Sequence, residues 1–493
     1  VQSLMQEYAL SDKEGIILMC LAESLLRVPD NFTANKLIKD KLQSGDFVSH
    51  IGKGEKWFVN ASTYGLVLTG KILKLDEDGW TSVLSNLLKN TSLPVIRNTI
   101  GQMMKILGKE FVLGQSIDEA LKNSIKLEKK GYRYSYDMLG EGAVTQDDSI
   151  RYYKDYVDAI KTIGSKTKGR TVHDRAGISV KISAIHPRYE LFEYERVMQE
   201  VVPKMVELCN LAKKNNISLF IDAEEMDRTE ISLEIMKELL SHKDLADWDG
   251  LGFVVQTYGK RASFVIDDLN DMCVKNNRKI MVRLVKGAYW DTEIKIAHEM
   301  GLDDFPVFTR KEHSDVSYVA CSKKLFEYNK NIYSCFATHN AVSVATVIEI
   351  AKSYPDVKYE FQKLHGMGDY MYHLITEGEY DIPTRIYAPV GVHRDLLPYL
   401  VRRLLENGAN SSFVKNIFDD DIPIKDMVKS PMALAKKNKF TKHPKVQYAK
   451  DINNLPNEED LWRDNSKGID MTNIKKVKKL SLIHISEPTR LDH

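Results

Sequence analysis

Short apolar runs that alternate with amphipathic helical stretches dominate the chain beyond residue 130, and this pattern most constrains its fold. Alternation of strand and helix is typical of a parallel sheet, because parallel strands need a long crossover connection. The eight predicted strands lie in YSYDMLG, ISVKISAI, SLFIDAEE, GFVVQTY, IMVRLVKG, YSCFATHN, KYEFQKL and RIYAPVG. Helical patterns such as YERVMQEVVPKMVELCNLAKKN separate them.

An eight-stranded (β/α) barrel of TIM type is the fold that this pattern predicts. The strand count fits, as does a length of roughly 250 to 300 residues. A doubly wound open sheet is the alternative. Against it, no predicted strand is followed by the G-x-G-x-x-G turn that usually binds a dinucleotide.

Four regions are predicted from the changes in pattern along the chain. Residues 1–120 form a helical arm and an accessory α domain, in which SDKEGIILMCLAESLLRVPD is a helix with capping-box spacing between Ser11 and Glu14. Residues 121–440 form the barrel. Residues 441–480 are polar and lysine-rich and form a linker, and residues 481–493 form a tail that matches neither pattern and is left out of the fold prediction.

Composition excludes several classes of protein. The formal net charge is +1, so no overall attraction to nucleic acid follows. Five cysteines without a C-x-x-C pair favour a reduced, cytoplasmic setting over a disulfide framework. No apolar run approaches the roughly 18 to 20 residues that span a bilayer, and no signal-peptide pattern begins the sequence.

Polar residues cluster where the predicted strands end, which is where barrel enzymes place their active sites. Burying an unpaired charge costs several kcal/mol, so these residues need a ligand, water or each other. Pairing among themselves, as Asp222 with Arg283, is the alternative to a ligand site. The residues are Glu141, Asp222, Glu224, Gln256, Arg283, Lys286, Thr338, His339, Gln362 and Tyr387.

A helix is also predicted in DLLPYLVRRLLENGANSSF, residues 395–413, with Asp395 as its cap and Gly408 at its end. Its spacing places one aromatic, two guanidiniums and one carboxylate on the same face. Two guanidiniums beside a tyrosine suit the bidentate binding of a small carboxylate; an exposed, salt-bridged face is the alternative. The four residues are Tyr399, Arg402, Arg403 and Glu406.

Other chemistries have weaker support in the sequence. The stretch FIDAEEMDR offers four carboxylates, but no histidine lies at ligand spacing beside it, so no metal site is predicted. Lys181 and Lys286 lie in predicted strands, and a desolvated lysine there could form an imine with a substrate. A flavin-free lyase or aldolase is therefore one rival function, and a noncatalytic amino-acid sensor is a second.

Ten runs, in their order along the chain, resemble the proline dehydrogenase domain of the bacterial bifunctional enzyme proline utilization A. The resemblance covers essentially residues 1–430, and WRDNSKGIDM resembles the junction where that family's aldehyde dehydrogenase domain begins, so the chain is expected to be truncated there. The runs are MLGEGAVT, ISVKISAIHPRYE, DAEEMDR, GFVVQTYGKRA, MVRLVKGAYWDTEIK, TRKEHSDVSY, FATHNAVS, YEFQKLHGMG, RIYAPVG and YLVRRLLENGANSSF.

The resemblance implies a distorted (β/α) barrel that binds FAD noncovalently. It implies oxidation of L-proline to Δ1-pyrroline-5-carboxylate by hydride transfer to flavin N5, the first step of proline catabolism to glutamate. Electrons would pass to a membrane quinone, from a cytoplasmic enzyme that associates peripherally with the inner membrane when reduced. The family's longest members carry an N-terminal DNA-binding domain; this chain begins within the helical arm, so no nucleic-acid binding is expected of it.

The resemblance also implies roles for individual residues at the substrate. Arg402, Arg403 and Lys181 would grip the proline carboxylate, and Glu141 would pair with the arginine face. The ring would be walled by Leu284, Tyr289, Tyr387 and Tyr399. Asp222 would hydrogen-bond a neighbouring tyrosine hydroxyl and shape the pocket.

A second set of residues would contact FAD. Arg283 and Gln256 fall at the flavin ring, and Trp290 falls on the adenine. Three residues fall along the phosphates and ribityl chain: Lys286, Thr338 and His339. Further expected contacts are Val285, Gly287, Ala288, Thr309, Lys311, Gln362 and Glu406.

Overall fold

The computed structural model describes residues 111–392 and 429–452 as continuous stretches. It also describes ten separate positions: Asp30, Phe32, Thr33, Lys36, Tyr399, Arg402, Lys475, Lys476, Lys478 and Lys479. The predicted accessory domain, including the helix at residues 11–30, and the last 13 residues lie almost wholly outside these stretches, as does most of the helix predicted at residues 395–413.

Eight parallel strands close into a barrel in the order of the sequence, each hydrogen-bonded to the next and β8 to β1. Each of them overlaps one of the eight predicted runs, so the barrel prediction is confirmed and the open sheet is excluded. The strands are β1 (Arg133–Met138), β2 (Gly177–Val180), β3 (Leu219–Ile221), β4 (Leu251–Gln256), β5 (Ile280–Val285), β6 (Ile332–Ala337), β7 (Tyr359–Leu364) and β8 (Thr384–Val390).

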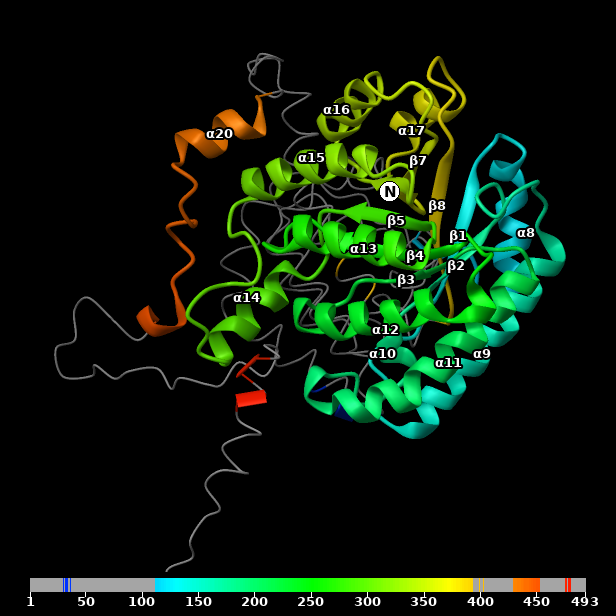
Figure 1. Ribbon diagram of the computed structural model, residues 1–493, viewed down its shortest axis with the longest axis horizontal. Coiled ribbons are helices and arrows are strands. Elements are labelled where there is room, and N and C mark those ends of the chain that lie inside the picture. The colour runs from blue at the N-terminus through cyan, green and yellow to red at the C-terminus, as the bar shows by residue number, and fades with distance from the viewer. Residues whose placement is uncertain are drawn as a thin grey trace, which may run out of the picture.

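Helices surround the barrel on its outer side (Figure 1). They are α8 (Ile117–Glu128), α9 (Gln146–Lys166), α10 (Ile182–Ile185), α11 (Tyr194–Lys214), α12 (Thr229–Ser241), α13 (Ala262–Asn276), α14 (Trp290–Glu299), α15 (Lys311–Glu327), α16 (Ala341–Ala351), α17 (Asp369–Thr376) and α20 (Pro431–Lys437). Short 3₁₀ helices cover Leu191–Glu193, Met226–Arg228, Lys243–Leu245 and Ala449–Asp451.

Local sequence explains where these helices begin and which face they bury. Thr145 and Asp148 form a capping box at the start of α9. Helix α11, predicted from its apolar periodicity, buries Val197, Val201 and Met205 against the barrel. The main core therefore lies between the outer faces of the strands and the helices.

The inside of the barrel is unusual because charged side chains fill much of it. Side chains alternate between the two faces of a strand, so Arg283 points inward where its neighbours Val282 and Leu284 point toward the helices. A small apolar group, centred on Phe220 and Met281, fills part of the interior. Ion pairs and hydrogen bonds occupy the rest, which places the chemistry inside the barrel and at its rim.

Residues 429–452, here called the C-terminal segment, pack along α14 and α15 (Figure 1). The backbone N–H of His443 donates to Thr309 Oγ1 at 2.9 Å, and Tyr448 stacks on Phe305 with ring centroids 5.8 Å apart. Residues 441–452 had been assigned to the predicted linker. Their contacts tie this part of it to the barrel beside Thr309.

Candidate active site

Arg283, on β5, is the centre of a buried polar network inside the barrel. Its Nη1 lies 2.8 Å from Asp222 Oδ1, and its Nε donates to Gln362 Oε1 at 2.5 Å. Its Nη2 lies 3.1 Å from both Ser135 Oγ and Ser179 Oγ. Each nitrogen of the guanidinium thus has a protein partner, and the predicted pairing of Asp222 with Arg283 is present.

Lys181, at the end of β2, joins this network from the other side. Its Nζ lies 2.6 Å from Asp137 Oδ1, 3.3 Å from Tyr387 Oη and 3.7 Å from Asp222 Oδ2, and Tyr387 donates to Asp222 Oδ2 at 2.6 Å. Burial lowers the pKa of Lys181, but Asp137, Tyr387 and Asp222 outweigh it and raise the pKa well above its ordinary value. Lys181 therefore stays an ammonium at neutral pH, which argues against an imine-forming role for it.

Asp137 is a residue of this network that the sequence analysis missed. It lies inside β1, is fully buried and forms the shortest of the ion pairs made by Lys181. The sequence pattern could have identified it, because Ser135 and Asp137 are two residues apart and therefore lie on the same, inner face of the strand. The prediction considered only polar residues at or after the end of each strand, which at β1 selected Glu141.

Arg402 and Glu141 form a bidentate ion pair at the C-terminal rim of the barrel. Arg402 Nη1 lies 2.5 Å from Glu141 Oε1, and Nη2 lies 2.8 Å from Oε2. The guanidinium also lies 5.0 Å from the ring centroid of Tyr289. Burial raises the pKa of the Glu141 carboxyl, but Arg402 brings it below its ordinary value. Arg403 and Glu406 lie outside the described residues.

An apolar wall stands beside this pair. Tyr399 is buried with Phe111, Leu139 and Met367, and Leu364 and Tyr387 pack against this group. Leu364 ends β7 on the inner face, two residues after Gln362, and the sequence analysis did not select it.

Leu284, by contrast, does not belong to this wall. It is fully buried in the core between the strands and the helices, because it follows the inward-pointing Arg283 on β5. The predicted role of Leu284 beside the substrate ring does not fit this position, and Leu364 stands where that role would be filled.

The loop after β5 carries several of the predicted cofactor residues. Gly287 has φ +136°, and a Cβ there would lie 2.5 Å from the ring of Tyr258. The N–H of Ala288 is directed at Gln256 Oε1, 3.4 Å away. Lys286 pairs with Asp315, which also holds Lys311 at 3.1 Å.

The remaining predicted cofactor residues lie around this loop. Trp290 Nε1 donates to the carbonyl of Phe308 at 2.8 Å, next to Thr309. His339 Nε2 accepts from the N–H of Leu364 at 3.0 Å, and the carbonyl of Thr338 accepts from Tyr372 at 2.6 Å. Val285 packs against the apolar group inside the barrel. Most of the described members of the set thus lie at or just after the C-terminal ends of β4, β5, β6 and β7, whereas Trp290 begins α14 and Thr309 and Lys311 lie just before and at the start of α15.

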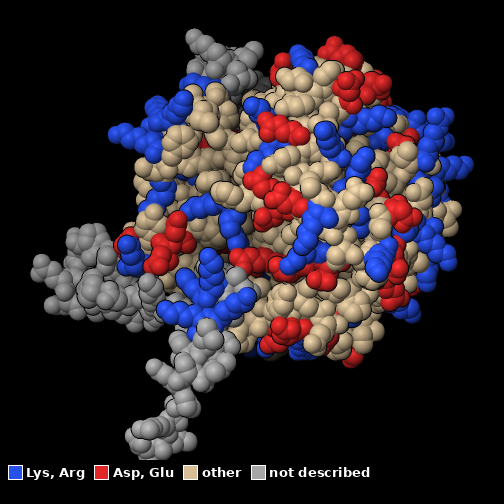
Figure 2. All heavy atoms as spheres, in the orientation of Figure 1, with Lys and Arg blue, Asp and Glu red and all other residues tan. Residues whose placement is uncertain are grey.

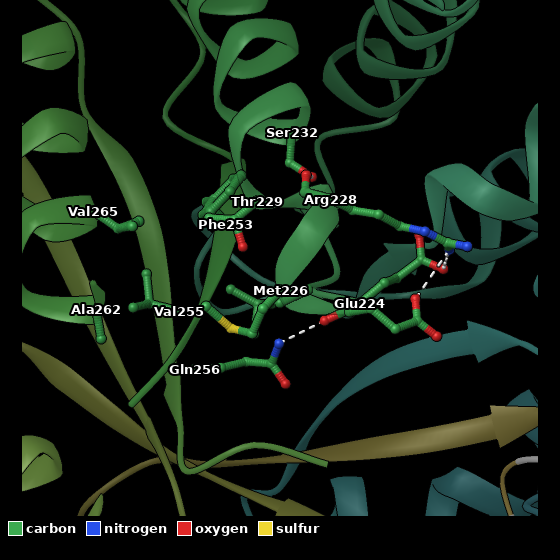
Figure 3. A pocket seen from close by; sticks show the side chains of 13 residues that line it. Glu224, Met226, Arg228, Thr229, Ser232, Phe253, Val255, Gln256, Ala262 and Val265 are labelled. Atoms are coloured by element: carbon green, nitrogen blue, oxygen red, sulfur yellow. Dashed lines mark hydrogen bonds and ion pairs between the residues drawn. The ribbon is translucent and has the colours of Figure 1, made fainter. Parts of the chain in front are cut away.

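A small hollow lies behind Glu224, between the ends of β3 and β4 and helices α12 and α13 (Figure 3). Met226, Arg228 and Gln256 are among its lining residues. Its volume of about 20 Å³ leaves room for about one water molecule. It is too small to hold an amino acid, so it is a neighbour of the candidate site.

Glu293, on α14, makes the stability of the barrel depend on pH. Its Oε1 accepts from the N–H of Met226 at 2.7 Å and from Tyr258 at 3.3 Å, and burial raises its pKa to about 7. The folded state therefore holds the proton more tightly than the unfolded state, whose pKa is near the ordinary 4.5. The stabilising effect of this proton is present below about pH 4.5 and is lost as the pH rises through about 7.

We expect wild type to lose roughly 2 kcal/mol of unfolding free energy relative to Glu293→Gln between about pH 4.5 and about pH 7.5. Gln keeps the accepting oxygen but cannot titrate. Denaturant unfolding across this range measures the difference. Glu299→Gln, exposed on the same helix, is the control. A difference that stays constant with pH would contradict the assignment.

Within the described residues, no group of histidine, cysteine, aspartate and glutamate side chains is arranged to hold a metal ion. Acidic and basic side chains intermingle over the barrel on the face drawn in Figure 2. That face therefore presents no broad region of one charge.

Comparison with known proteins places the chain in a family. Residues 120–416 match the family profile described as proline dehydrogenase, and residues 1–111 match one described as the DNA-binding domain of proline dehydrogenase. The second description stands against the expectation that the chain binds no nucleic acid. That expectation stays a prediction, which a DNA-binding measurement would decide.

Several relatives carry the same similarity. The chain is 46% identical to bifunctional protein PutA of Klebsiella aerogenes and of Escherichia coli over 98% of its length, and it spans 37% of each relative. Proline dehydrogenase 1 of Bacillus subtilis is 25% identical over 62% of this chain and 88% of that protein.

Solved structures give the same result. A crystal structure of bifunctional proline utilization A superposes with a TM-score of 0.74 at 42% identity, covering all of this chain and 49% of that one. A crystal structure of proline utilization A of Bradyrhizobium japonicum superposes with a TM-score of 0.72 at 44% identity, covering 97% of this chain and 47% of that one. With the profile match over residues 120–416, these similarities show that the chain belongs to the proline dehydrogenase family.

Proposed function

We propose that this chain oxidises L-proline to Δ1-pyrroline-5-carboxylate with FAD as electron acceptor. The observation that carries the proposal is the Arg402–Glu141 pair, which lies over Tyr289 at the C-terminal rim, where barrel enzymes act. Arg402 keeps N–H groups that Glu141 does not occupy, and a guanidinium held in place in this way suits the carboxylate of an amino acid. The family membership supports proline as that amino acid.

The residues around the loop after β5 fit FAD. Gly287 has no room for a side chain beside Tyr258, and its φ of +136° sets the path of this loop. Lys286 and Lys311 bring cationic charge for a pyrophosphate, and Trp290 offers an indole face for adenine. Arg283 and Gln256 would hold the flavin ring from inside the barrel. FAD, when bound, supplies the hydride acceptor at N5.

On the substrate side, the described residues bind, orient and exclude water. Arg402 would hold the carboxylate, and Lys181 would add a second fixed cation. Asp222 fixes the hydroxyl of Tyr387 at 2.6 Å, so that this ring is held at the inner wall. Tyr399 and Leu364 would cover the apolar part of the proline ring.

The visible absorption spectrum tests the proposal. We expect the purified protein to be yellow and its flavin absorption to bleach when L-proline is added without oxygen, whereas D-proline should leave it unchanged. A colourless protein that yields a borohydride-trapped adduct on Lys286 would favour the lyase or aldolase instead. A protein that binds proline and leaves flavin and dye unreduced would be a sensor.

The resemblance extends the proposal to partners. We propose a membrane quinone as final acceptor, peripheral contact of the cytoplasmic enzyme with the inner membrane after reduction, and an aldehyde dehydrogenase domain as partner in the full-length parent. Within the part of the chain that the structure describes, no helix is long and apolar enough to cross a membrane. Sedimentation with anionic vesicles, with and without proline, tests the contact; equal binding in both states would contradict it.

A further inference from the structure

Glu224, which follows β3, holds a position between two functional loops. Its carboxyl is buried, and Oε1 accepts from the N–H of Ser183 at 3.1 Å. Oε2 accepts from the hydroxyl of Ser183 and from Arg228 Nη1 at 3.0 Å. Both oxygens of the carboxyl thus hold one serine on the neighbouring helix α10.

Ser183 in turn holds the loop that carries Glu141. The N–H of Gly142 donates to Ser183 Oγ at 2.9 Å, and the N–H of Ala143 donates to the carbonyl of Ser183 at 2.8 Å. Glu141 lies directly before these two anchored amides. The position of the Glu141 carboxylate, and of Arg402 paired with it, therefore depends on a chain of contacts that begins at Glu224.

The backbone of Glu224 reaches the other side of the site. Its carbonyl accepts from Gln256 Nε2 at 2.7 Å (Figure 3). This contact fixes the amide so that Gln256 Oε1 faces the N–H of Ala288, 3.4 Å away. One residue thus connects the proposed substrate clamp with the proposed cofactor loop.

A stabilising ion pair with Arg228 is the simpler explanation of this glutamate. Arg228, however, also has Glu225 at 3.2 Å, and burial raises the pKa of Glu224 to about 7 although Arg228 acts to lower it. A buried carboxylate costs folding energy, so a role limited to stability would be served as well by an apolar side chain. The contacts to Ser183 favour a role in geometry.

We propose that Glu224 is a positioning residue for substrate binding, which acts through Ser183 to fix Glu141 and thereby the guanidinium of Arg402. This proposal rests on the proposed function, in which Arg402 binds the proline carboxylate. Displacing a binding group by about 1 Å can cost about 100-fold. Loss of this support should therefore weaken substrate binding more than it slows turnover.

The test compares Glu224→Gln and Ser183→Ala with Glu225→Gln in the full chain with FAD bound. The control Glu225→Gln removes a carboxylate charge at the adjacent residue. Among the hydrogen bonds described, the side chain of Glu225 makes none with Ser183. We expect both test variants to raise the KM for proline about 10-fold or more, with kcat within about 3-fold of wild type. The inhibition constant of cyclopentanecarboxylate, which lacks the oxidisable nitrogen, should rise in parallel.

Hydrogen exchange provides a readout that does not depend on proline oxidation. The amides of Gly142 and Ala143 should exchange faster in both test variants and at the wild-type rate in Glu225→Gln. Unchanged exchange overturns the proposal, and so does faster exchange with an unchanged KM. If Glu224→Gln does not fold, Ser183→Ala alone tests the proposal, because it is the smaller change and removes only one hydroxyl group. If the proposed function is wrong, proline will not reduce the flavin of the wild-type protein. Hydrogen exchange at Gly142 and Ala143 would then decide by itself whether Glu224 positions Glu141.

Discussion

Replacement of Arg402 by methionine is expected to raise the KM for proline by roughly two orders of magnitude, while FAD stays bound. A hydrogen bond to a charged group contributes about 1.5 to 3 kcal/mol, and the N–H groups of Arg402 that Glu141 does not occupy would make up to two of them to the substrate carboxylate. Methionine also leaves Glu141, which is partly buried, without its bidentate partner. The uncompensated carboxylate would then repel the carboxylate of the substrate.

Steady-state kinetics and the flavin-to-protein ratio measure this effect. Arg402→Lys keeps the charge but loses the fork, and it should lie between wild type and methionine. The double variant Glu141→Gln, Arg402→Met should recover part of the loss because it removes the repelling charge. Arg196→Met, on the exposed face of α11, is the matched control. We also expect Arg403→Met to raise KM; unchanged KM in both arginine variants would refute the clamp.

The strands and their order could be predicted from the sequence because a period of two and a length of about six residues are local properties. Each of the eight runs contains most of a strand, although the second half of ISVKISAI forms α10, and the rim residues followed from the barrel rule. The local sequence could not predict which of the inward-pointing charged residues pair with each other. Asp222 and Arg283 are 61 residues apart, and their contact depends on how β3 and β5 are staggered around the closed barrel.

The errors have physical causes of the same kind. The role given to Leu284 came from resemblance, and the alternation around Arg283 would have opposed it while favouring Leu364. The packing of the C-terminal segment could not be predicted, because its polar composition hides two aromatic contacts, Phe440 with His313 and Tyr448 with Phe305. Such contacts depend on tertiary packing, which the periodicity of apolar residues along the sequence does not predict.

The polar contacts at the N-terminal end of the barrel were not predicted, because the barrel rule selects only residues at the opposite rim. There Arg385 and Glu360 are fully buried and form a bidentate pair, with Nε at 2.6 Å and Nη2 at 3.0 Å from the two carboxylate oxygens. The other N–H groups of Arg385 donate to the carbonyls of Tyr134, Arg175 and His173. One side chain thus ties β8 to β7, β1 and the loop before β2.

Arg385→Met is therefore expected to lower the unfolding free energy by roughly 3 to 5 kcal/mol, because it leaves the carboxylate of Glu360 buried and poorly compensated. Burial raises the pKa of Glu360, but Arg385 brings it below its ordinary value, so the stabilisation in wild type is present above about pH 4.5 and is lost as the pH falls through the folded pKa. In the variant this carboxyl should instead have a raised pKa. The deficit, measured by denaturant unfolding at equal flavin content, should accordingly be largest near neutral pH and shrink in acid.

Two variants separate the buried pair from a general effect of removing charge. Arg133→Met removes a partly exposed guanidinium 3.2 Å from the same carboxylate, and solvent screening should limit its cost to under about 2 kcal/mol. The double variant Glu360→Leu, Arg385→Met removes both charges and should regain much of the stability, since apolar side chains can replace a buried ion pair. An Arg385→Met deficit that does not change with pH, or that the double variant deepens, would mean that the carbonyl contacts, rather than the ion pair, hold this end of the barrel closed.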